Sequence, residues 1–234
     1  TGLIGKPIDC TLFAWDTEKS HQHKNRKSKP AAYHEVRRIL CDTITMLFGS
    51  ACYELDEYEG DDIVATAVYQ ADPVDTVYIV SGDKDLQQLA EGNVHYYCLH
   101  TRAVLSRAFI LNKFNVKSPN QAAIAQAITG DPTDSIAGIP KWGPKKTKKV
   151  FENVAPEMNF DEALAAVDDQ IPESLKPDFY ASLARTIPDM QVPGVPEPAP
   201  LTFVPITEVD ALEIPGLADR YQTLCAAYAG GELT

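Results

Sequence analysis

At 234 residues, with a net charge of −12, the chain is long enough to bury a full hydrophobic core in one large domain or two small ones. Its hydrophobic and charged fractions, 44% and 23%, are ordinary for a soluble globular protein, and no apolar run is long enough to cross a bilayer. The five cysteines are widely spaced without a CxxC pair, which disfavours zinc and a disulfide framework and predicts a reducing, cytoplasmic setting.

The acidic charge is unevenly distributed along the chain. Residues 151–234 contain 15 acids and 3 bases, whereas residues 1–150 contain 18 of each. Eight of those 18 acids fall in clusters where bound cations would offset them. With metal bound, the first 150 residues would present a positive surface, so the net charge does not exclude a nucleic-acid partner.

The first predicted elements are a strand, a basic segment and a helix. Residues 8–15 have the composition of a buried strand, which ends at Asp16. Residues 19–29 contain five bases, two histidines and no acid, so they form either a solvated loop or a segment that binds a polyanion. Residues 33–48 carry apolar side chains at helical spacing, and Gly49 ends this helix.

An acidic cluster follows a short predicted strand at residues 51–55. Glu59, Asp61 and Asp62 open a helix, where acids interact favourably with the positive end of the helix dipole. Three acids in four residues are more than one helix terminus needs, and their mutual repulsion is costly without a cation. The cluster is therefore a candidate metal site.

Two more acids, Asp83 and Asp85, follow the most strand-like run of the chain, residues 76–80. A short helix at residues 86–89 comes next. In open α/β sheets, binding sites form at the carboxyl ends of strands, and these carboxylates are expected there.

A third group of acids, the pair Asp131 and Asp134, follows a predicted strand at residues 93–98 and helices at residues 106–114 and 118–130. This pair has an alternative role in capping a helix, because a proline follows Asp131 and suits the first helical position. Taken alone, the pair favours that capping role.

Residues 136–146, IAGIPKWGPKK, combine a tight turn with lysines. Gly138 and Gly143 bracket the turn, and a proline starts the following helix. Residues 141–149 contain five lysines and no acid. Backbone N–H groups at a helix N-terminus bind phosphate well, so the glycine spacing and the lysines favour a phosphate-binding hairpin over a merely solvated helix.

The C-terminal third carries less chemistry. Helices are predicted at residues 160–167, 175–183 and 211–228, and the proline-rich residues 187–205 are expected to be extended. We expect residues 152–234 to form an acidic helical region that packs on the core away from any nucleic acid.

The acids as a group predict a metal centre. They lie at strand ends or helix starts, and parallel strands would bring most of them to one sheet edge. Carboxylates without histidine or cysteine select Mg²⁺ or Mn²⁺, and two such ions about 4 Å apart form a clamp used for phosphodiester hydrolysis. The predicted ligands are Asp16, Glu59, Asp61, Asp62, Asp83, Asp85, Asp131 and Asp134.

Three motifs together resemble the 5′-nuclease family, which comprises flap endonucleases, phage 5′-to-3′ exonucleases and the 5′-nuclease domain of bacterial DNA polymerase I. They are YEGDD, IVSGDKDLQQL and GDPTDSIAGIPKWGPKK, in this order. The resemblance covers roughly residues 8–150 and implies an α/β fold. A PIN-like core with a mainly parallel central sheet would occupy residues 1–117, and a helix-hairpin-helix module that grips duplex DNA would occupy residues 118–151.

The resemblance also implies roles for single residues. Glu59, Asp61 and Asp83 would line a first metal site, Asp85, Asp131 and Asp134 would serve a second, and Asp16 and Asp62 would contribute directly or through water. The catalytic residues would be Lys24, or His23 in its place, with Arg26 and Lys84. DNA contacts would come from Lys27, Lys29, Gly138, Ile139, Lys141, Gly143, Lys145 and Lys146, and a potassium ion would bind carbonyls around residues 136–139.

Two features depart from the family pattern. The family begins with an apolar strand whose final aspartate binds metal, whereas Asp16 has the context of the family's second aspartate. Either a preceding segment is missing from the sequence, or the protein lacks that ligand. The basic segment at residues 19–29, which would form the arch over a 5′ single strand, is also shorter than in the family and lacks the usual Phe-Arg pair.

The sequence therefore predicts a monomeric two-metal nuclease that acts on DNA 5′ ends, flaps or RNA primers in replication or repair, beside a polymerase. Compact size favours a phage or another virus as the source. One alternative is a DNA-binding module that has lost catalysis, and another is a PIN-like ribonuclease. The acidic clusters disfavour the first alternative, and the lysine-rich hairpin disfavours the second.

Overall fold

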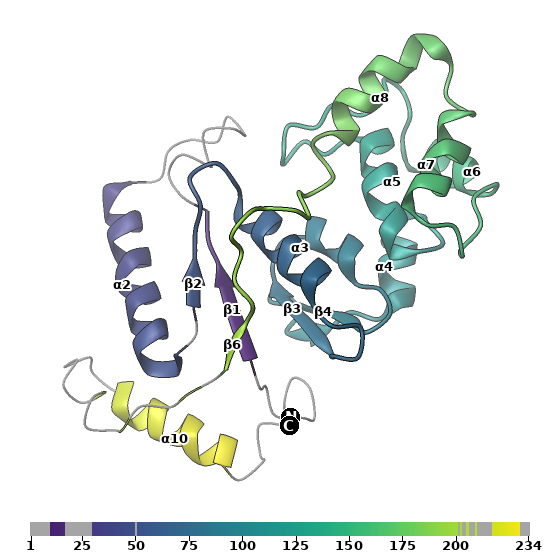
Figure 1. Cartoon of the computed structure of the whole chain (residues 1–234). Coiled ribbons are helices and arrows are strands. Elements are labelled where there is room, and N and C mark those ends of the chain that lie inside the picture. Colours follow the sequence, from purple (N-terminus) through teal and green to yellow (C-terminus); the bar gives the residue numbers. More distant parts are fainter. Residues whose placement is uncertain are drawn as a thin grey trace. The chain divides into compact units, whose positions relative to one another are not determined.

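The computed structural model describes residues 10–16, 30–49, 51–200, 202, 205, 209 and 217–229. The chain forms two compact units (Figure 1). The terminal unit contains the described residues up to Ile63 and from Val192 onwards, and the central unit contains Val64–Gln191. This division differs from the predicted segments 1–117, 118–151 and 152–234, because the chain returns to the terminal unit after residue 191.

The terminal unit is built on a three-stranded sheet in the order β2-β1-β6. The central strand β1 (Cys10–Ala14) pairs in parallel with β2 (Ala51–Tyr53) and antiparallel with β6 (Ala199–Pro200). Helix α2 (Ala31–Phe48) precedes β2 and contacts it.

A left-handed glycine ends α2 and lets the chain turn into β2. Gly49 has φ +63°, and its N–H donates to the Thr45 carbonyl at 2.9 Å. A residue with a Cβ is disfavoured in this conformation, which explains why the helix ends where the sequence predicts. Helix α10 (Leu217–Ala229) packs near this end, and the Tyr221 hydroxyl donates to the Leu47 carbonyl at 3.1 Å.

The central unit is built on a second three-stranded sheet in the order β3-β4-β5. Strand β4 (Val94–Cys98) pairs in parallel with β3 (Val77–Ser81) and antiparallel with β5 (Ala103–Val104). Helix α3 (Gly60–Gln70) leads into this unit from the terminal unit.

Short helices complete the central unit around one almost entirely apolar helix. In α5 (Ala122–Thr129), residues 122–128 are all buried, because α5 contacts helices on several sides (Figure 1). A helix that is apolar all round belongs in a core. The other helices are η1 (Asp85–Leu89), α4 (Arg107–Phe114), η2 (Pro119–Gln121), α6 (Pro144–Phe151), α7 (Phe160–Asp168), η3 (Glu173–Leu175) and α8 (Lys176–Leu183).

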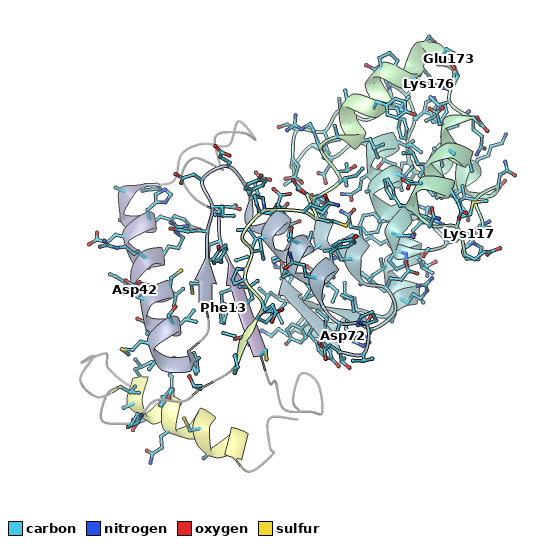
Figure 2. The ribbon with its side chains drawn as sticks, in the orientation of Figure 1. Phe13, Asp42, Asp72, Lys117, Glu173 and Lys176 are labelled. Atoms are coloured by element: carbon cyan, nitrogen blue, oxygen red, sulfur yellow. The ribbon has the colours of Figure 1, made fainter. Side chains whose placement is uncertain are left out.

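An ion-pair cluster joins α7 to α8. The Lys176 ammonium lies 2.7 Å from the Asp168 carboxylate and 2.8 Å from that of Glu173 (Figure 2). Asp168 also accepts from the Tyr180 hydroxyl at 2.8 Å. The last turn of α7 is thereby tied to the first turns of α8.

Two expectations about these elements need correction. In place of one mainly parallel central sheet there are two three-stranded mixed sheets, because the two-residue strands β5 and β6 add an antiparallel edge to each of them. Strands this short leave no period-2 pattern in the sequence. The capping interpretation of Asp131 is also wrong, since residues 131–136 form a turn in which Asp131 and Ile136 exchange backbone hydrogen bonds at 2.8 Å.

Among the described residues, no helix has the length and apolar character needed to span a membrane.

Candidate metal centre

The first acidic cluster lies at the start of α3. Glu59, Asp61 and Asp62 are partly buried and each offers an oxygen within 4.8 Å of the others. The Glu59 N–H donates to Asp62 Oδ2 at 3.0 Å, so the third acid of the cluster also caps the helix. The structure thus shows the capping role, and metal binding by this cluster stays a prediction.

Asp16 joins the first cluster from a distant part of the chain. The Gly60 N–H donates to Asp16 Oδ1 at 2.6 Å, which fixes the carboxylate that follows β1 beside the start of α3. A Cβ on Gly60 would lie 3.4 Å from Asp16 Oδ1 and from the Trp15 backbone. These are ordinary van der Waals distances, so the hydrogen bond, and not the lack of a side chain at residue 60, joins these two segments 44 residues apart.

Arg37 fixes the backbone at Asp16. Its Nη1 donates to the Asp16 carbonyl at 2.5 Å and lies 2.5 Å from Glu54 Oε2. A single nitrogen of the guanidinium group therefore links the end of β1 to Glu54, the residue that follows β2. The sequence analysis missed Arg37, because one arginine on a helix with other charged residues carries no distinguishing signal.

The second acidic cluster lies in the central unit. Asp85, Asp131 and Asp134 offer oxygens within 4.8 Å of one another. Asp85 comes from η1 and the other two from the turn at residues 131–136. Asp85 and Asp131 are only 8% and 6% exposed, so this is a buried group of carboxylates, which is costly without positive charge nearby.

Burial raises the pKa of the Asp85 carboxyl, and the charges of Asp83 and Asp134 raise it further. The hydrogen bond from Gln126 opposes that shift. Gln126 Nε2 donates to Asp85 Oδ1 at 2.6 Å, while its buried Oε1 has no hydrogen-bond partner among the described residues. The donor set fits a hard cation such as Mg²⁺ or Mn²⁺, because it consists of carboxylate and amide oxygens.

Lys84 reaches into the second cluster. Its ammonium forms an ion pair with Asp131 and lies 3.6 Å from Asp134. Burial alone would lower the pKa of Lys84, but the hydrogen bond and charge of Asp131 outweigh it and leave that pKa raised. Likewise, burial would raise the pKa of Asp131, but the contact with Lys84 leaves it lowered.

Hydrogen bonds of its backbone and of its side chain hold Asp83 next to the second cluster. Its Oδ1 accepts from the Asp85 N–H at 2.9 Å, and its N–H donates to Ser81 Oγ at 3.0 Å. The hydroxyl of the fully buried Tyr96 lies 2.8 Å from the Ser81 carbonyl and 2.6 Å from that of Asp83. Asp83 belongs to the central unit and Glu59 to the terminal unit, so their joint metal site stays a prediction.

The hairpin at residues 136–146 differs in part from expectation. The Gly138 N–H donates to Ser182 Oγ at 3.0 Å, and the Ile139 N–H donates to the Ile128 carbonyl at 2.9 Å. These two N–H groups are therefore used inside the protein, and the DNA contacts expected of Gly138 and Ile139 stay predictions. Lys141, Lys145 and Lys146 are exposed, and the Lys146 ammonium lies 4.7 Å from the Trp142 ring centre.

The predicted residues of the basic segment lie outside the described residues. They are His23, Lys24, Arg26, Lys27 and Lys29. Their roles stay predictions.

Two buried polar residues of the site were also missed by the sequence analysis. Gln126 and Tyr96 stand in an apolar helix and strand, where a lone polar side chain reads as part of the core. A weak signal was available for Gln126, because it is the one polar residue between Ala122 and Ile128.

A family model supports the resemblance that the motifs suggested. Residues 9–115 match the model described as 5′-3′ exonuclease, N-terminal resolvase-like domain. This match includes Asp16, the first cluster, and Asp83 with Asp85.

Curated relatives agree with this match. DNA polymerase I of Rhizobium leguminosarum is 38% identical over 109 residues, which is 46% of this chain and 11% of the relative. DNA polymerase I of Lactococcus lactis subsp. cremoris is 26% identical over 251 aligned positions, 97% of this chain and 27% of the relative. A 5′-3′ exonuclease of Mycoplasmopsis pulmonis is 30% identical over 59% of this chain and 47% of the relative. The chain thus spans less than half the length of each.

Solved structures share the fold at low sequence identity. The chain is similar to T5 5′-exonuclease with bound zinc ions, with a TM-score of 0.52, 16% identity and coverage of 93% of this chain and 83% of that one. It is also similar to bacteriophage T5 flap endonuclease in a complex with DNA and metal ions, with a TM-score of 0.50, 16% identity and coverage of 94% and 83%.

The resemblance to the 5′-nuclease family is therefore confirmed, and residues 9–115 match its 5′-3′ exonuclease, N-terminal resolvase-like domain.

Proposed function

We propose that the chain hydrolyses phosphodiester bonds of DNA at 5′ ends or flaps, with divalent ions held by the two acidic clusters. The observation that carries this proposal is the second cluster, in which Asp85, Asp131 and Asp134 converge in a buried position. A buried group of three carboxylates is costly to fold and has a clear use as a metal site. The 5′-3′ exonuclease domain match and the DNA polymerase I relatives support DNA as the substrate class.

The proposed function assigns metal-binding, positioning and phosphate-binding roles to different residues of the chain. Asp85, Asp131 and Asp134 would hold one ion, and Glu59, Asp61 and Asp62 would hold another, with Asp16 fixed alongside. Bound Mg²⁺ or Mn²⁺ lowers the pKa of a water and neutralises charge that develops on the phosphate. Gln126 orients the Asp85 carboxylate, and Arg37 fixes the backbone at Asp16. The lysines of the basic segment and of α6 would bind the phosphates of the substrate.

The grip on duplex DNA is assigned to residues 118–151. This segment contains α5, the turn at residues 131–136, the hairpin and α6, and Lys145 and Lys146 are exposed at the start of α6. Exposed lysines at a helix start suit a phosphate backbone. Carbonyls around residues 136–139 are the proposed potassium site, and the polymerase I relatives make a replicative polymerase the proposed partner, with RNA primers a further substrate.

The test is cleavage of a 5′-flap DNA labelled at its 3′ end, with Mg²⁺ and with EDTA. The wild type is expected to cut near the flap junction only with Mg²⁺. Asp85→Asn is expected to reduce cleavage by at least about 100-fold, an effect typical of losing a group that stabilises the transition state, while duplex binding stays within a few-fold of the wild type.

The matched control is Asp169→Asn, which neutralises an exposed acid in the same unit. It is expected to leave cleavage unchanged. Tight DNA binding without any cleavage by the wild type would favour a catalytically inactive binding module instead, and cleavage of RNA alone would favour a PIN-like ribonuclease.

A further inference from the structure

The ammonium of Lys84 lies among the three carboxylates that would hold the second metal ion. It forms an ion pair with Asp131 and lies 3.6 Å from Asp134. We infer that Lys84 is a built-in counter-ion of this cluster, which occupies the place of the divalent ion in the metal-free protein and must withdraw when metal binds. This inference rests on the proposed metal-dependent function.

Electrostatics explains why a counter-ion is needed. Three carboxylates whose oxygens lie within 4.8 Å of one another repel each other strongly where water is scarce. One ammonium offsets only part of this charge, whereas a divalent ion offsets more of it and coordinates several oxygens at once. Lys84 therefore keeps the turn and η1 together without metal but leaves the cluster attractive to a divalent cation.

Gln126 indicates independently that a lysine is not the final occupant. This side chain is 4% exposed and holds Asp85 Oδ1 through its Nε2 at 2.6 Å. Its Oε1 is buried without a hydrogen-bond partner among the described residues. Magnesium retains several of its waters when it binds to protein, so an unpaired acceptor next to Asp85 suits a hydrated ion.

Lys84 is able to leave the cluster without a change in the fold. Its side chain is 31% exposed, and a lysine has four rotatable bonds between its backbone and its ammonium. In the sequence Lys84 stands between Asp83 and Asp85, directly before the first residue of η1. If Lys84 were instead a permanent structural ion pair, its removal would weaken the cluster for every cation.

The test is the affinity of the protein for Mn²⁺, measured by electron paramagnetic resonance in an Asp61→Asn background that weakens the first cluster. Lys84→Met removes the ammonium but keeps the apolar stem, and we expect it to tighten Mn²⁺ binding roughly tenfold, because a competing positive charge is lost. Lys84→Arg, which keeps the charge, is expected to bind Mn²⁺ within about threefold of the parent. Lys84→Gln is the second neutral variant should Lys84→Met fold poorly.

Lys113→Met is the matched control. Lys113 is an exposed lysine whose ammonium lies 2.7 Å from Gln87 Oε1, and it interacts with Asp85 only through longer-range charge. Its removal is expected to change Mn²⁺ affinity much less than removal of Lys84. Equal changes in Mn²⁺ affinity for the two variants would mean that Lys84 acts only through its charge and not through its place in the cluster, which would overturn the inference.

Thermal unfolding supplies a second readout. Without metal, Lys84→Met is expected to unfold at a lower temperature than the parent, and saturating Mn²⁺ is expected to remove that difference. Unchanged or weaker Mn²⁺ binding by both neutral variants would overturn the inference but leave the proposed nuclease intact. Absence of Mn²⁺ binding in every protein, the parent included, would overturn the proposed metal centre as well.

Discussion

Single polar side chains that are buried or partly buried control the geometry of this site. Arg37, Tyr96 and Gln126 each bind a backbone or side-chain oxygen at or next to a candidate metal ligand. Buried polar groups of this kind are costly unless they are paired, so each has a defined orientation. The carboxylates are thereby positioned before any ligand binds, which is what metal coordination with a strict geometry requires.

Tyr96→Phe tests this positioning at the residue scale. The change removes only the hydroxyl that contacts the Ser81 and Asp83 carbonyls, so it should destabilise the protein by about 1–2 kcal/mol. We also expect a lower kcat for flap cleavage with little change in KM, because Asp83 loses its support while DNA contacts remain. Urea unfolding and steady-state kinetics measure the two effects.

Tyr97→Phe is the control for this change. Tyr97 is the next residue of β4 and points to the opposite face of the strand. Equal losses in the two variants would mean that the Tyr96 hydroxyl has no special role in placing Asp83.

At the scale of elements, two left-handed glycines shape the turn that carries Asp131 and Asp134. Gly130 and Gly138 have φ values of +76° and +69°, and a Cβ on Gly138 would lie 2.4 Å from the Gly130 backbone nitrogen. The backbones of Gly130 and Gly138 therefore lie so close that neither residue has room for a Cβ. The structure gives Gly138 a packing role, and the DNA contact expected of it stays a prediction.

Gly138→Ala should therefore destabilise the central unit by at least about 2 kcal/mol, because it combines a disfavoured φ with a backbone clash. Gly143→Ala is a matched control in the same hairpin, since Gly143 has φ −107° and no atom within 4 Å of a Cβ. Thermal unfolding distinguishes the two. Similar melting temperatures for both variants would contradict the packing role of Gly138.

At the scale of the whole molecule, the proposed DNA binding is opposed by a net charge of −12. The positive charge available to a phosphate backbone is local, as in the four lysines of α6, Lys145, Lys146, Lys148 and Lys149. Binding through such contacts releases counterions, so affinity should fall steeply as salt rises.

Replacing Lys145 and Lys146 together by alanine should reduce the slope of log affinity against log salt by roughly 1.8 for duplex DNA, if each contacts one phosphate. Lys117→Ala is the control, because the Lys117 ammonium donates to the Glu152 carbonyl at 2.9 Å within the protein. Fluorescence anisotropy at several salt concentrations gives the slopes. An unchanged slope in the double variant would remove α6 from the proposed DNA surface.

The sequence by itself determined the main elements and the acidic residues. Strands β1 to β4, helices α2 to α8 and the ends at Gly49 and Ser106 follow from hydrophobic periodicity and capping, which are local properties. The acids were found for the same reason, since clusters such as 59–62 are visible in the sequence alone. The motifs that carry the family resemblance are likewise short and contiguous.

Only the tertiary structure decided which groups meet. The contact of Asp16 with Gly60, that of Gln126 with Asp85 and the insertion of Lys84 between Asp131 and Asp134 join distant segments or depend on the path of a side chain. The edge strands β5 and β6 and the consumed N–H groups of Gly138 and Ile139 depend on partners far along the chain. Local sequence patterns record the propensity of a residue, whereas pairing across the fold depends on packing that no short window contains.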